Sequence, residues 1–381
     1  MTDSPAAASP TAEEPLRLLG LDGTPDGTGG SGLPVPDEPL DLRAAYRDMV
    51  LARRFDTEAI ALQRQGELGL WPSMLGQEGA QVGAAHALRA QDMVFPTYRE
   101  HAVLWCRGVD PVHALALFRG TTLGGWEPAE HRFALYTIVL GAQTLHAVGF
   151  AMGIVRDGRT GTGDPDTDRA VLVFVGDGAL SEGETNEAFV WAGAQRLPVV
   201  FFCQNNQWAI STPYRVQSRV PAARRAGGFG FDGVRVDGND VLACHAVTRA
   251  ALEKARAGGG PTLIEAVTYR RNPHTTSDDD RRYRTADDND HWAALDPVLR
   301  LRAHLESPAD PVGRAPVPHE EFLAALAAEE EALAARLRSG CRGLASPPPN
   351  TPFLHTLARP TRHLEAQMRE HLAFVESGES A

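Results

Sequence analysis

The chain has 381 residues, of which 43% are hydrophobic, so it is long enough and apolar enough to bury a sizeable core. Its 37 Lys and Arg against 49 Asp and Glu give a formal net charge of −12, which argues against binding to the phosphate backbone of nucleic acid. The four cysteines have no metal-binding spacing, and neither a secretory signal nor a membrane-spanning apolar run occurs. We therefore expect a globular, cytoplasmic protein with reduced thiols and with neither nucleic acid nor membrane as a partner.

The N-terminal region is rich in Ala, Pro, Thr, Gly and Asp, and its few apolar residues cannot offset the entropy lost on ordering. This composition predicts a disordered tail over residues 1–40. From Asp41, which can cap a helix, apolar residues recur at helical spacing. Helices are also predicted over 81–88 and 111–118, so the main domain, expected over residues 41–300, begins with helices.

The middle of the chain alternates between apolar runs, typical of strands buried on both faces of a sheet, and segments with helical spacing. Strands are predicted over 171–175, 199–203, 233–236 and 262–266, and helices over 187–195 and 241–257. Residues 274–290 are almost entirely polar and predict a loop. Residues 301–381 predict a helical extension interrupted by the Pro-rich segment 346–352. These elements indicate an α/β fold with a doubly wound parallel sheet and helical N- and C-terminal extensions.

Polar residues follow the first two of these strands at the point where each strand ends. Gly176-Asp177-Gly178 follows one strand and Gln204-Asn205-Asn206 follows the next, so a carboxylate and a carboxamide are expected at the same edge of the sheet. Both offer the hard oxygen ligands that Mg²⁺ prefers, and glycine lets the backbone approach a phosphate closely. Alone, Gly-Asp-Gly is also typical of an ordinary turn, so the pairing with Asn206 is what indicates a metal site.

A capping-box pattern, Ser181-Glu-Gly-Glu184, follows the glycines. It predicts that a helix begins near Ser181. The N-terminal amides of that helix would then be directed at an anion bound beside the metal.

The run from GDG to NN resembles the thiamine-diphosphate motif. Further segments resemble, in the same order, the alpha subunit of the decarboxylating component of 2-oxo acid dehydrogenase complexes. They are Leu75-Gly-Gln-Glu78, Phe95-Pro-Thr-Tyr-Arg99, Asp177-Gly-Ala-Leu-Ser-Glu-Gly183, Phe201 to Pro213, Arg235 to Asp240 and Glu265 to Arg270. The resemblance covers roughly residues 42–300 and is greatest to branched-chain enzymes, with pyruvate dehydrogenase next. It implies a sheet of the thiamine-diphosphate-binding type and oxidative decarboxylation of a 2-oxo acid.

This resemblance implies roles for particular residues. Mg²⁺ would be held by the side chains of Asp177 and Asn206 and by the backbone carbonyl of Trp208. Tyr98 and Arg99 match residues that contact the diphosphate, and a fork-shaped, always charged guanidinium suits that partner. The full set expected to bind thiamine diphosphate is Tyr98, Arg99, Leu140, Gly176, Asp177, Gly178, Ala179, Asn206, Trp208, Arg270 and His274. Leu140 would pack against the middle of the cofactor, with an ordinary core leucine as the alternative.

His274 matches the catalytic histidine of a mobile loop in the same family. An imidazole titrates near neutrality and can donate a proton as the acyl group moves to a lipoyl group. By residue type alone, a surface histidine is the alternative. Arg270 is expected to hold this loop or the diphosphate.

The resemblance also implies partners. In this family the carboxylate that activates the aminopyrimidine ring lies on a separate beta subunit, in a two-alpha, two-beta heterotetramer. The acyl group passes to a lipoyl-bearing acyltransferase. We therefore expect the chain to be inactive by itself.

Three departures from the family pattern concern the same region. Gln204 stands where some branched-chain relatives have arginine, Pro273 where relatives can have histidine, and Thr275 where animal relatives have a phosphorylated serine. The threonine at position 275 argues against control by a kinase.

The alternatives to this function are the alpha subunit of pyruvate or acetoin dehydrogenase, a nicotinamide oxidoreductase, and a degenerate scaffold subunit. The missing third glycine of G-x-G-x-x-G argues against the second, and the presence of all four of Asp177, Asn206, Arg99 and His274 against the third.

Overall fold

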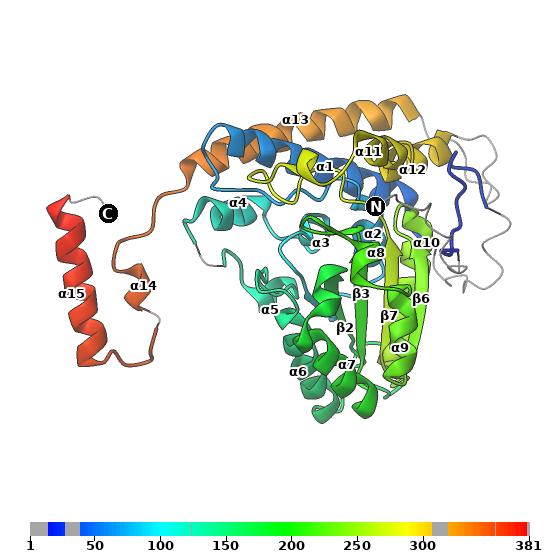
Figure 1. The fold of residues 1–381 in the computed structure, drawn as a ribbon, viewed down its shortest axis with the longest axis horizontal. Helices are drawn as coiled ribbons and strands as arrows, with labels where there is room; N and C mark the ends of the chain where they lie inside the picture. Colours follow the sequence, from blue (N-terminus) through cyan, green and yellow to red (C-terminus); the bar gives the residue numbers. More distant parts are fainter. Residues whose placement is uncertain (1–13, 27–38, 123, 307–318, 355, 379–381) are drawn as a thin grey trace, which may run out of the picture.

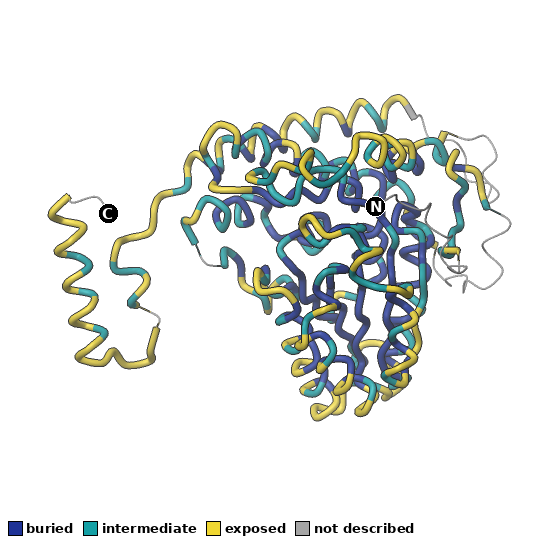
Figure 2. The backbone as a smooth tube through the Cα atoms, in the orientation of Figure 1, coloured by how far each residue is buried: buried dark blue, intermediate teal, exposed yellow. Residues whose placement is uncertain are grey.

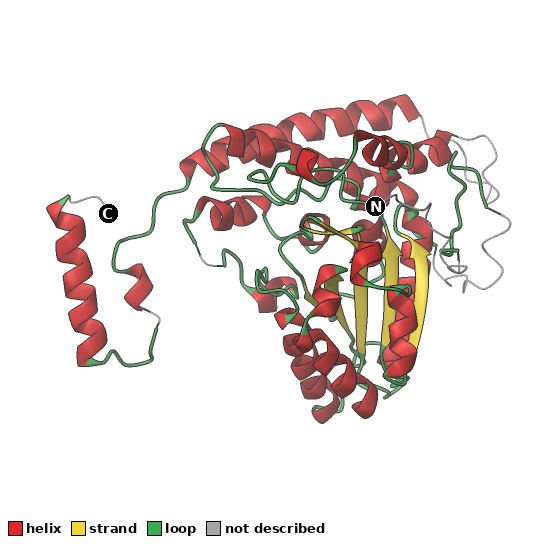
Figure 3. Cartoon of the chain, in the orientation of Figure 1, coloured by secondary structure: helices red, strands yellow, loops and turns green. Residues whose placement is uncertain are grey.

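The computed structural model describes residues 14–26, 39–122, 124–306, 319–354 and 356–378. Its centre is a five-stranded sheet in which every neighbouring pair of strands is parallel, in the order β1-β2-β3-β7-β6 (Figure 3). The strands are β1 (Met93–Phe95), β2 (Val171–Gly176), β3 (Val199–Asn205), β6 (Asp232–Asp237) and β7 (Thr262–Val267). A separate two-stranded ribbon is formed by β4 (Trp208–Ala209) and β5 (Thr212–Pro213). The four predicted strands are confirmed. β1 was not predicted, because a strand of three residues is too short to give a recognisable pattern in the sequence.

Helices account for most of the remaining described residues (Figure 1). Before β2 they are α1 (Leu42–Arg64), α2 (Glu78–His86), α3 (His101–Cys106), α4 (Pro111–Arg119), α5 (Pro128–His131) and α6 (Ala142–Arg156). Between β2 and β7 they are α7 (Gly183–Gln195), α8 (Tyr214–Gln217), α9 (Arg225–Gly228) and α10 (Val241–Arg256), with 3₁₀ turns η1 (Gly178–Ser181) and η2 (Ala222–Arg224). After β7 come η3 (Asp280–Arg282), α11 (Ala286–Ala293), α12 (Pro297–Glu306), α13 (His319–Gly343), α14 (Thr351–Leu354) and α15 (Arg362–Ser377).

Both faces of the sheet are covered, which confirms the doubly wound arrangement. Leu172 and Phe174 of β2 join a core shared with α1, α2 and α10, whereas the alternating residues Val171, Val173 and Val175 join a core shared with α6 and α7. This alternation is the two-residue period of a strand, and it explains why the whole run is apolar. Strands β1, β2, β3 and β7 are almost wholly buried, whereas the edge strand β6 is partly exposed (Figure 2).

The prediction of a disordered N-terminal tail is wrong for residues 14–26, the longer of its two described parts. The backbone N–H groups of Leu18 and Leu19 donate to Asp240 Oδ2 at 2.6 and 2.7 Å, and Leu16 pairs with the edge of β6. Leu19 is buried. A few apolar residues therefore anchor a segment whose average composition suggested disorder. Residues 39 and 40 are also described, with Leu40 buried, and the remainder of the predicted tail lies outside the described residues.

Two local predictions also differ from the structure. The helix expected near Ser181 begins at Gly183, because the chain leaves β2 through η1, which buries Ala179 and Leu180. No side-chain capping bond forms there. The predicted loop 274–290 contains η3 and the start of α11. Two acidic residues in the first turn of α11 favour a helix despite the polar sequence.

The C-terminal segment is helical where it is described, as predicted. The long helix α13 packs against α1 and α4, whereas α14 and α15 lie apart from the main body (Figure 1). α15 has no buried residue. No helix in the described ranges is long and apolar enough to cross a membrane.

Candidate active site

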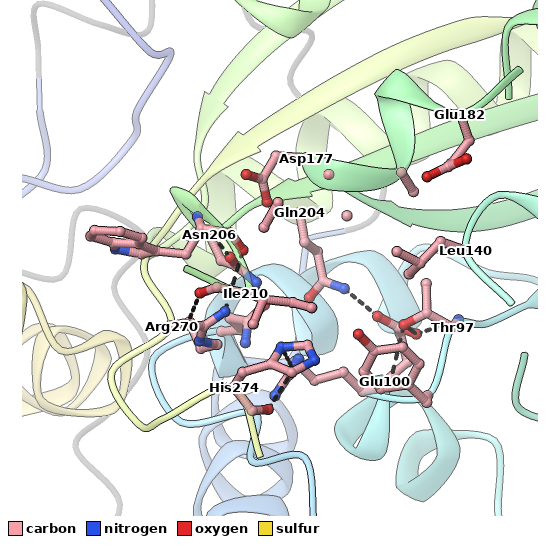
Figure 4. Close-up of a pocket in the computed structure, with 18 residues that line it drawn as sticks. Thr97, Glu100, Leu140, Asp177, Glu182, Gln204, Asn206, Ile210, Arg270 and His274 are labelled. Carbon is pink, nitrogen blue, oxygen red and sulfur yellow. Dashed lines mark hydrogen bonds between the residues drawn. The ribbon is translucent and has the colours of Figure 1, made fainter. Parts of the chain in front are cut away.

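The register of the sheet brings the two predicted ligand segments together. Gly176 at the end of β2 lies opposite Gln204 in β3, so Asp177 and Asn206 follow at the same edge. A cavity opens at this edge, and Figure 4 shows side chains from several distant segments around it. All the residues expected to bind the cofactor line this cavity: Tyr98, Arg99, Leu140, Gly176, Asp177, Gly178, Ala179, Asn206, Trp208, Arg270 and His274.

Asp177 is a buried carboxylate without a counter-ion among the described residues. It is 2% exposed, and its Oδ2 accepts one side-chain hydrogen bond, from Gln217 Nε2 at 2.8 Å. Burial raises its pKa to about 6. A carboxylate in such a place is costly unless a cation is bound to it, so the residue fits a metal ligand.

Two further oxygen atoms that could bind a metal lie along the same edge as Asp177: Asn206 Oδ1 and the Trp208 carbonyl oxygen. The Asn206 amide donates to Gln77 Oε1 at 3.2 Å, and its own Oδ1 accepts from the Trp208 N–H at 3.3 Å. The Trp208 carbonyl accepts from Arg270 Nη1 at 3.3 Å. A carboxylate, an amide oxygen and a backbone carbonyl form a donor set that suits Mg²⁺, with phosphate and water completing the coordination.

Several polar atoms around the cavity lack a partner within the described residues. They are Gln77 Nε2, Gln204 Oε1, Gln217 Oε1 and Trp208 Nε1, all buried. Buried polar groups are normally hydrogen-bonded, so this cluster fits a cavity that receives a polar ligand. Gly178 keeps the backbone close here, since a Cβ would lie 2.7 Å from the Cβ of Ala209.

His274 is held against Arg99 at the mouth of the cavity. Arg99 Nη2 donates to the His274 carbonyl oxygen at 2.8 Å and lies 3.2 Å from His274 Nδ1. Because a guanidinium can only donate, Nδ1 is the acceptor and the ring hydrogen is on Nε2. Burial, followed by the charges of Arg99 and Arg270, lowers the pKa of His274 to about 3. The imidazole is therefore neutral in the ligand-free chain, contrary to the expected titration near neutrality.

Arg270 fixes the backbone around the cavity. It donates to the carbonyl of Ile210 at 2.8 Å and to the hydroxyl of Tyr283 at 3.0 Å. Tyr283 in turn donates to Asp278, whose Oδ2 accepts from the His274 N–H at 2.9 Å. Arg270 was expected to hold either the His274 loop or the diphosphate, and these contacts are those of a residue that holds the loop. Burial and the nearby Arg99 lower its pKa to about 10, and two neighbouring guanidiniums favour an anionic ligand.

Other residues that line the cavity were not predicted as part of the site. They are Gln77, Thr97, Glu100, Glu182, Gln204, Ala209 and Ile210. Glu100 is 1% exposed and accepts from the Thr97 N–H and hydroxyl at 2.5 and 2.6 Å and from Gln204 Nε2. Burial raises its pKa. The only sign in the sequence that Glu100 belongs to the site was its position directly after Arg99, because the burial of a glutamate cannot be recognised from the sequence.

The chain was compared with known proteins. Residues 46–309 match the model of the dehydrogenase E1 component. The chain is 49% identical over 294 residues to the 3-methyl-2-oxobutanoate dehydrogenase subunit alpha of Mycobacterium tuberculosis, covering 77% of each chain. It is 38% identical to the pyruvate dehydrogenase E1 component subunit alpha of Bacillus cereus, covering 70% of each chain. With the Acholeplasma laidlawii subunit of the same name it shares 35% identity, covering 88% of this chain and 94% of the other.

Proposed function

The chain belongs to the dehydrogenase E1 component family, and from this we propose that it is the alpha subunit of a branched-chain 2-oxo acid dehydrogenase. Its substrate would be 3-methyl-2-oxobutanoate or a similar 2-oxo acid. The observation that carries this proposal is the identity of 49% to a subunit of that name, together with a cavity lined by every expected site residue. The runner-up is a pyruvate dehydrogenase alpha subunit, which relatives at 35–38% identity favour.

The cavity would hold thiamine diphosphate by its diphosphate end. Asp177, Asn206 and the Trp208 carbonyl would bind Mg²⁺, and Tyr98, Arg99 and the backbone at Gly176–Ala179 would contact the phosphates. Leu140 would pack against the middle of the cofactor. When bound, the cofactor supplies the electron sink for loss of CO₂. The protein contributes orientation and, at His274 Nε2–H, a hydrogen-bond donor for transfer of the acyl group to a lipoyl-bearing acyltransferase.

A beta subunit would complete the site in a two-alpha, two-beta assembly. An exposed apolar surface on the adjacent helices α6 and α7 supports this. It is formed by Gly149, Phe150 and Gly153 on α6 and by Val190, Trp191 and Ala194 on α7, and we call it the α6–α7 face. Phe150, Val190 and Trp191 are 40%, 49% and 44% exposed. Val139 and Leu140, in the segment that leads into α6, are also exposed, and Leu140 lines the cavity. Exposed apolar patches of this kind mark protein–protein contacts.

The two glycines of the α6–α7 face strengthen the argument. A Cβ at Gly149 or Gly153 would meet no atom of the chain within 4 Å, so nothing within the described structure requires glycine there. Glycine inside a helix costs about 1 kcal/mol relative to alanine. A neighbouring subunit that approaches the helix backbone closely would account for both.

Gly153→Ala is expected to affect the free chain and the assembly in opposite directions. The free alpha chain should gain up to about 1 kcal/mol of unfolding free energy from helix propensity. Its affinity for the beta subunit should fall about tenfold or more, because an added methyl overpacks a close contact. Chemical denaturation measures the first effect and sedimentation of the mixed subunits the second.

Gly227→Ala in α9 is the matched control, since its Cβ also meets no atom within 4 Å but lies off the α6–α7 face. It should stabilise the chain without weakening assembly. Equal affinity of the Gly153→Ala chain and the unmodified chain for the beta subunit would rule out this face as the interface.

The function itself is tested by reconstitution. The chain is purified with and without its beta-type partner, loaded with thiamine diphosphate and Mg²⁺, and assayed with 3-methyl-2-oxobutanoate and with pyruvate. We expect no turnover by the chain alone. The pair should prefer the branched substrate by roughly 10- to 200-fold in kcat/KM, the range that one or two methyl groups provide. Preference for pyruvate would identify the chain as a pyruvate dehydrogenase alpha subunit instead. Full activity without a partner would contradict the proposal that a beta subunit completes the site.

A further inference from the structure

His274 lies in the segment 271–276, which we call the active-site loop. This loop is held along one side by residues 71–75, part of the connection between α1 and α2. The Thr276 N–H donates to the Trp71 carbonyl at 3.0 Å, and the Trp71 N–H donates to Thr276 Oγ1 at 2.9 Å. At the other end, the Arg271 N–H donates to the Leu75 carbonyl at 3.1 Å. His274 lies between these bonded positions, so the placement of its imidazole depends on residues 71–75.

Residues 71–75 are fixed from the core side by one carboxylate, Asp56 on α1. Asp56 Oδ1 accepts from Trp71 Nε1 at 2.8 Å and from the Met74 N–H at 3.0 Å, and Oδ2 accepts from the Ser73 hydroxyl at 2.6 Å. Asp56 is 2% exposed. No basic side chain in the described ranges forms an ion pair with it. All of its side-chain bonds therefore end on the segment that supports the loop.

Ser73 connects Asp56 to the loop by two routes. Its single hydroxyl hydrogen is donated to Asp56, which leaves the oxygen's lone pairs to accept from Asn272 Nδ2 at 2.8 Å and from the Leu75 N–H at 3.2 Å. Its carbonyl accepts from Arg99 Nη1 at 2.5 Å, and Arg99 Nη2 donates to the His274 carbonyl. The side-chain route and the Arg99 route thus start at one serine and end on either side of Pro273.

We propose that Asp56, acting through Ser73 and Asn272, is a positioning residue that holds the active-site loop with His274 directed into the cavity. We call these three residues the Asp56–Ser73–Asn272 relay. Its effect on catalysis rests on the proposed function, whereas its effect on loop order does not. Because a carboxylate only accepts, it fixes the direction of each bond in the relay. In Asp56→Asn the introduced amide would donate to Ser73, whose hydroxyl already accepts from Asn272 and Leu75 and would then face a third donor and lose its own acceptor.

Hydrogen exchange of the full-length chain tests the relay directly. In Asn272→Ala and Asp56→Asn, we expect the amides of residues 271, 272 and 274–276 to exchange about five- to tenfold faster, the effect of losing one net hydrogen bond. In the reconstituted enzyme, kcat for acyl transfer to the lipoyl group should fall about tenfold, whereas the Kd for thiamine diphosphate should stay within about twofold. Asn272 is half-buried, so its alanine variant provides a readout even if Asp56→Asn folds poorly.

A double-mutant cycle separates positioning from general destabilisation. If Asp56 acts through Asn272, then Asp56→Asn should add little to loop exchange in an Asn272→Ala background. Thr57→Ala on the same helix, whose exposed hydroxyl bonds only to the Arg53 carbonyl, should leave the loop unchanged. Fully additive effects, unchanged exchange at 271–276, or equal acceleration across the whole chain would each overturn the relay. Faster loop exchange in an enzyme that turns over no 2-oxo acid would overturn the proposed function and leave the relay standing.

Discussion

Replacing Asp177 by asparagine is expected to abolish Mg²⁺-dependent binding of thiamine diphosphate and to lower the activity of the alpha–beta complex more than about 100-fold. Removing residues that merely support metal ligands already costs about 10- to 100-fold, so losing a ligand should cost more. The amide keeps the shape of the side chain and its contact with Gln217 but removes the negative charge that the metal requires. Calorimetric titration of the complex with thiamine diphosphate, with and without Mg²⁺, measures the effect.

The same substitution is expected to stabilise the cofactor-free chain. The pKa of Asp177 rises from 3.8 to about 6 on folding, so burial of its charged form costs about 3 kcal/mol above pH 6. This cost decreases as the pH falls through 6 and is absent below 3.8. Asp177→Asn should therefore raise the unfolding free energy at pH 7 but not at pH 3.5. Metal-independent cofactor binding, or a less stable variant at pH 7, would contradict the metal site.

The meeting of Asp177 and Asn206 could be predicted from the sequence because it follows from local rules. Two continuous apolar runs gave two buried parallel strands, and the ends of such strands share an edge. Arg99 and His274 have no such relation. They are 175 residues apart, and only the resemblance to a family placed them in one site.

The features that were predicted wrongly or missed from the sequence also have physical causes. Composition over 40 residues hid the short apolar stretch around Leu19 that pairs with the edge of β6. The buried contacts of Glu100 with Thr97 and Gln204 depend on packing between distant segments, and a glutamate that is 1% exposed looks like any surface glutamate in the sequence. The capping box at Ser181 was overridden because the residues before it pack into the core as a 3₁₀ turn.

His274→Ala is expected to separate the two halves of the reaction. Decarboxylation measured with an artificial electron acceptor should persist within a few-fold, because the metal and diphosphate ligands are untouched. Transfer of the acyl group to a lipoyl domain should fall about 10²- to 10³-fold, the usual contribution of a positioned hydrogen-bond donor. The reason lies in the geometry: Arg99 occupies Nδ1, so Nε2–H is the free donor of the ring.

The adjacent Thr275→Ala provides the control, since the Thr275 side chain makes only a local contact with the Ser277 N–H. It should alter neither half-reaction by more than about twofold, because the half-buried Thr275 side chain makes no contact with the rest of the described site that its removal would break. A His274→Ala enzyme that loses decarboxylation and acyl transfer equally would place the histidine in cofactor binding instead. Full retention of acyl transfer would assign this hydrogen-bond donor to another group, with the beta subunit as its source.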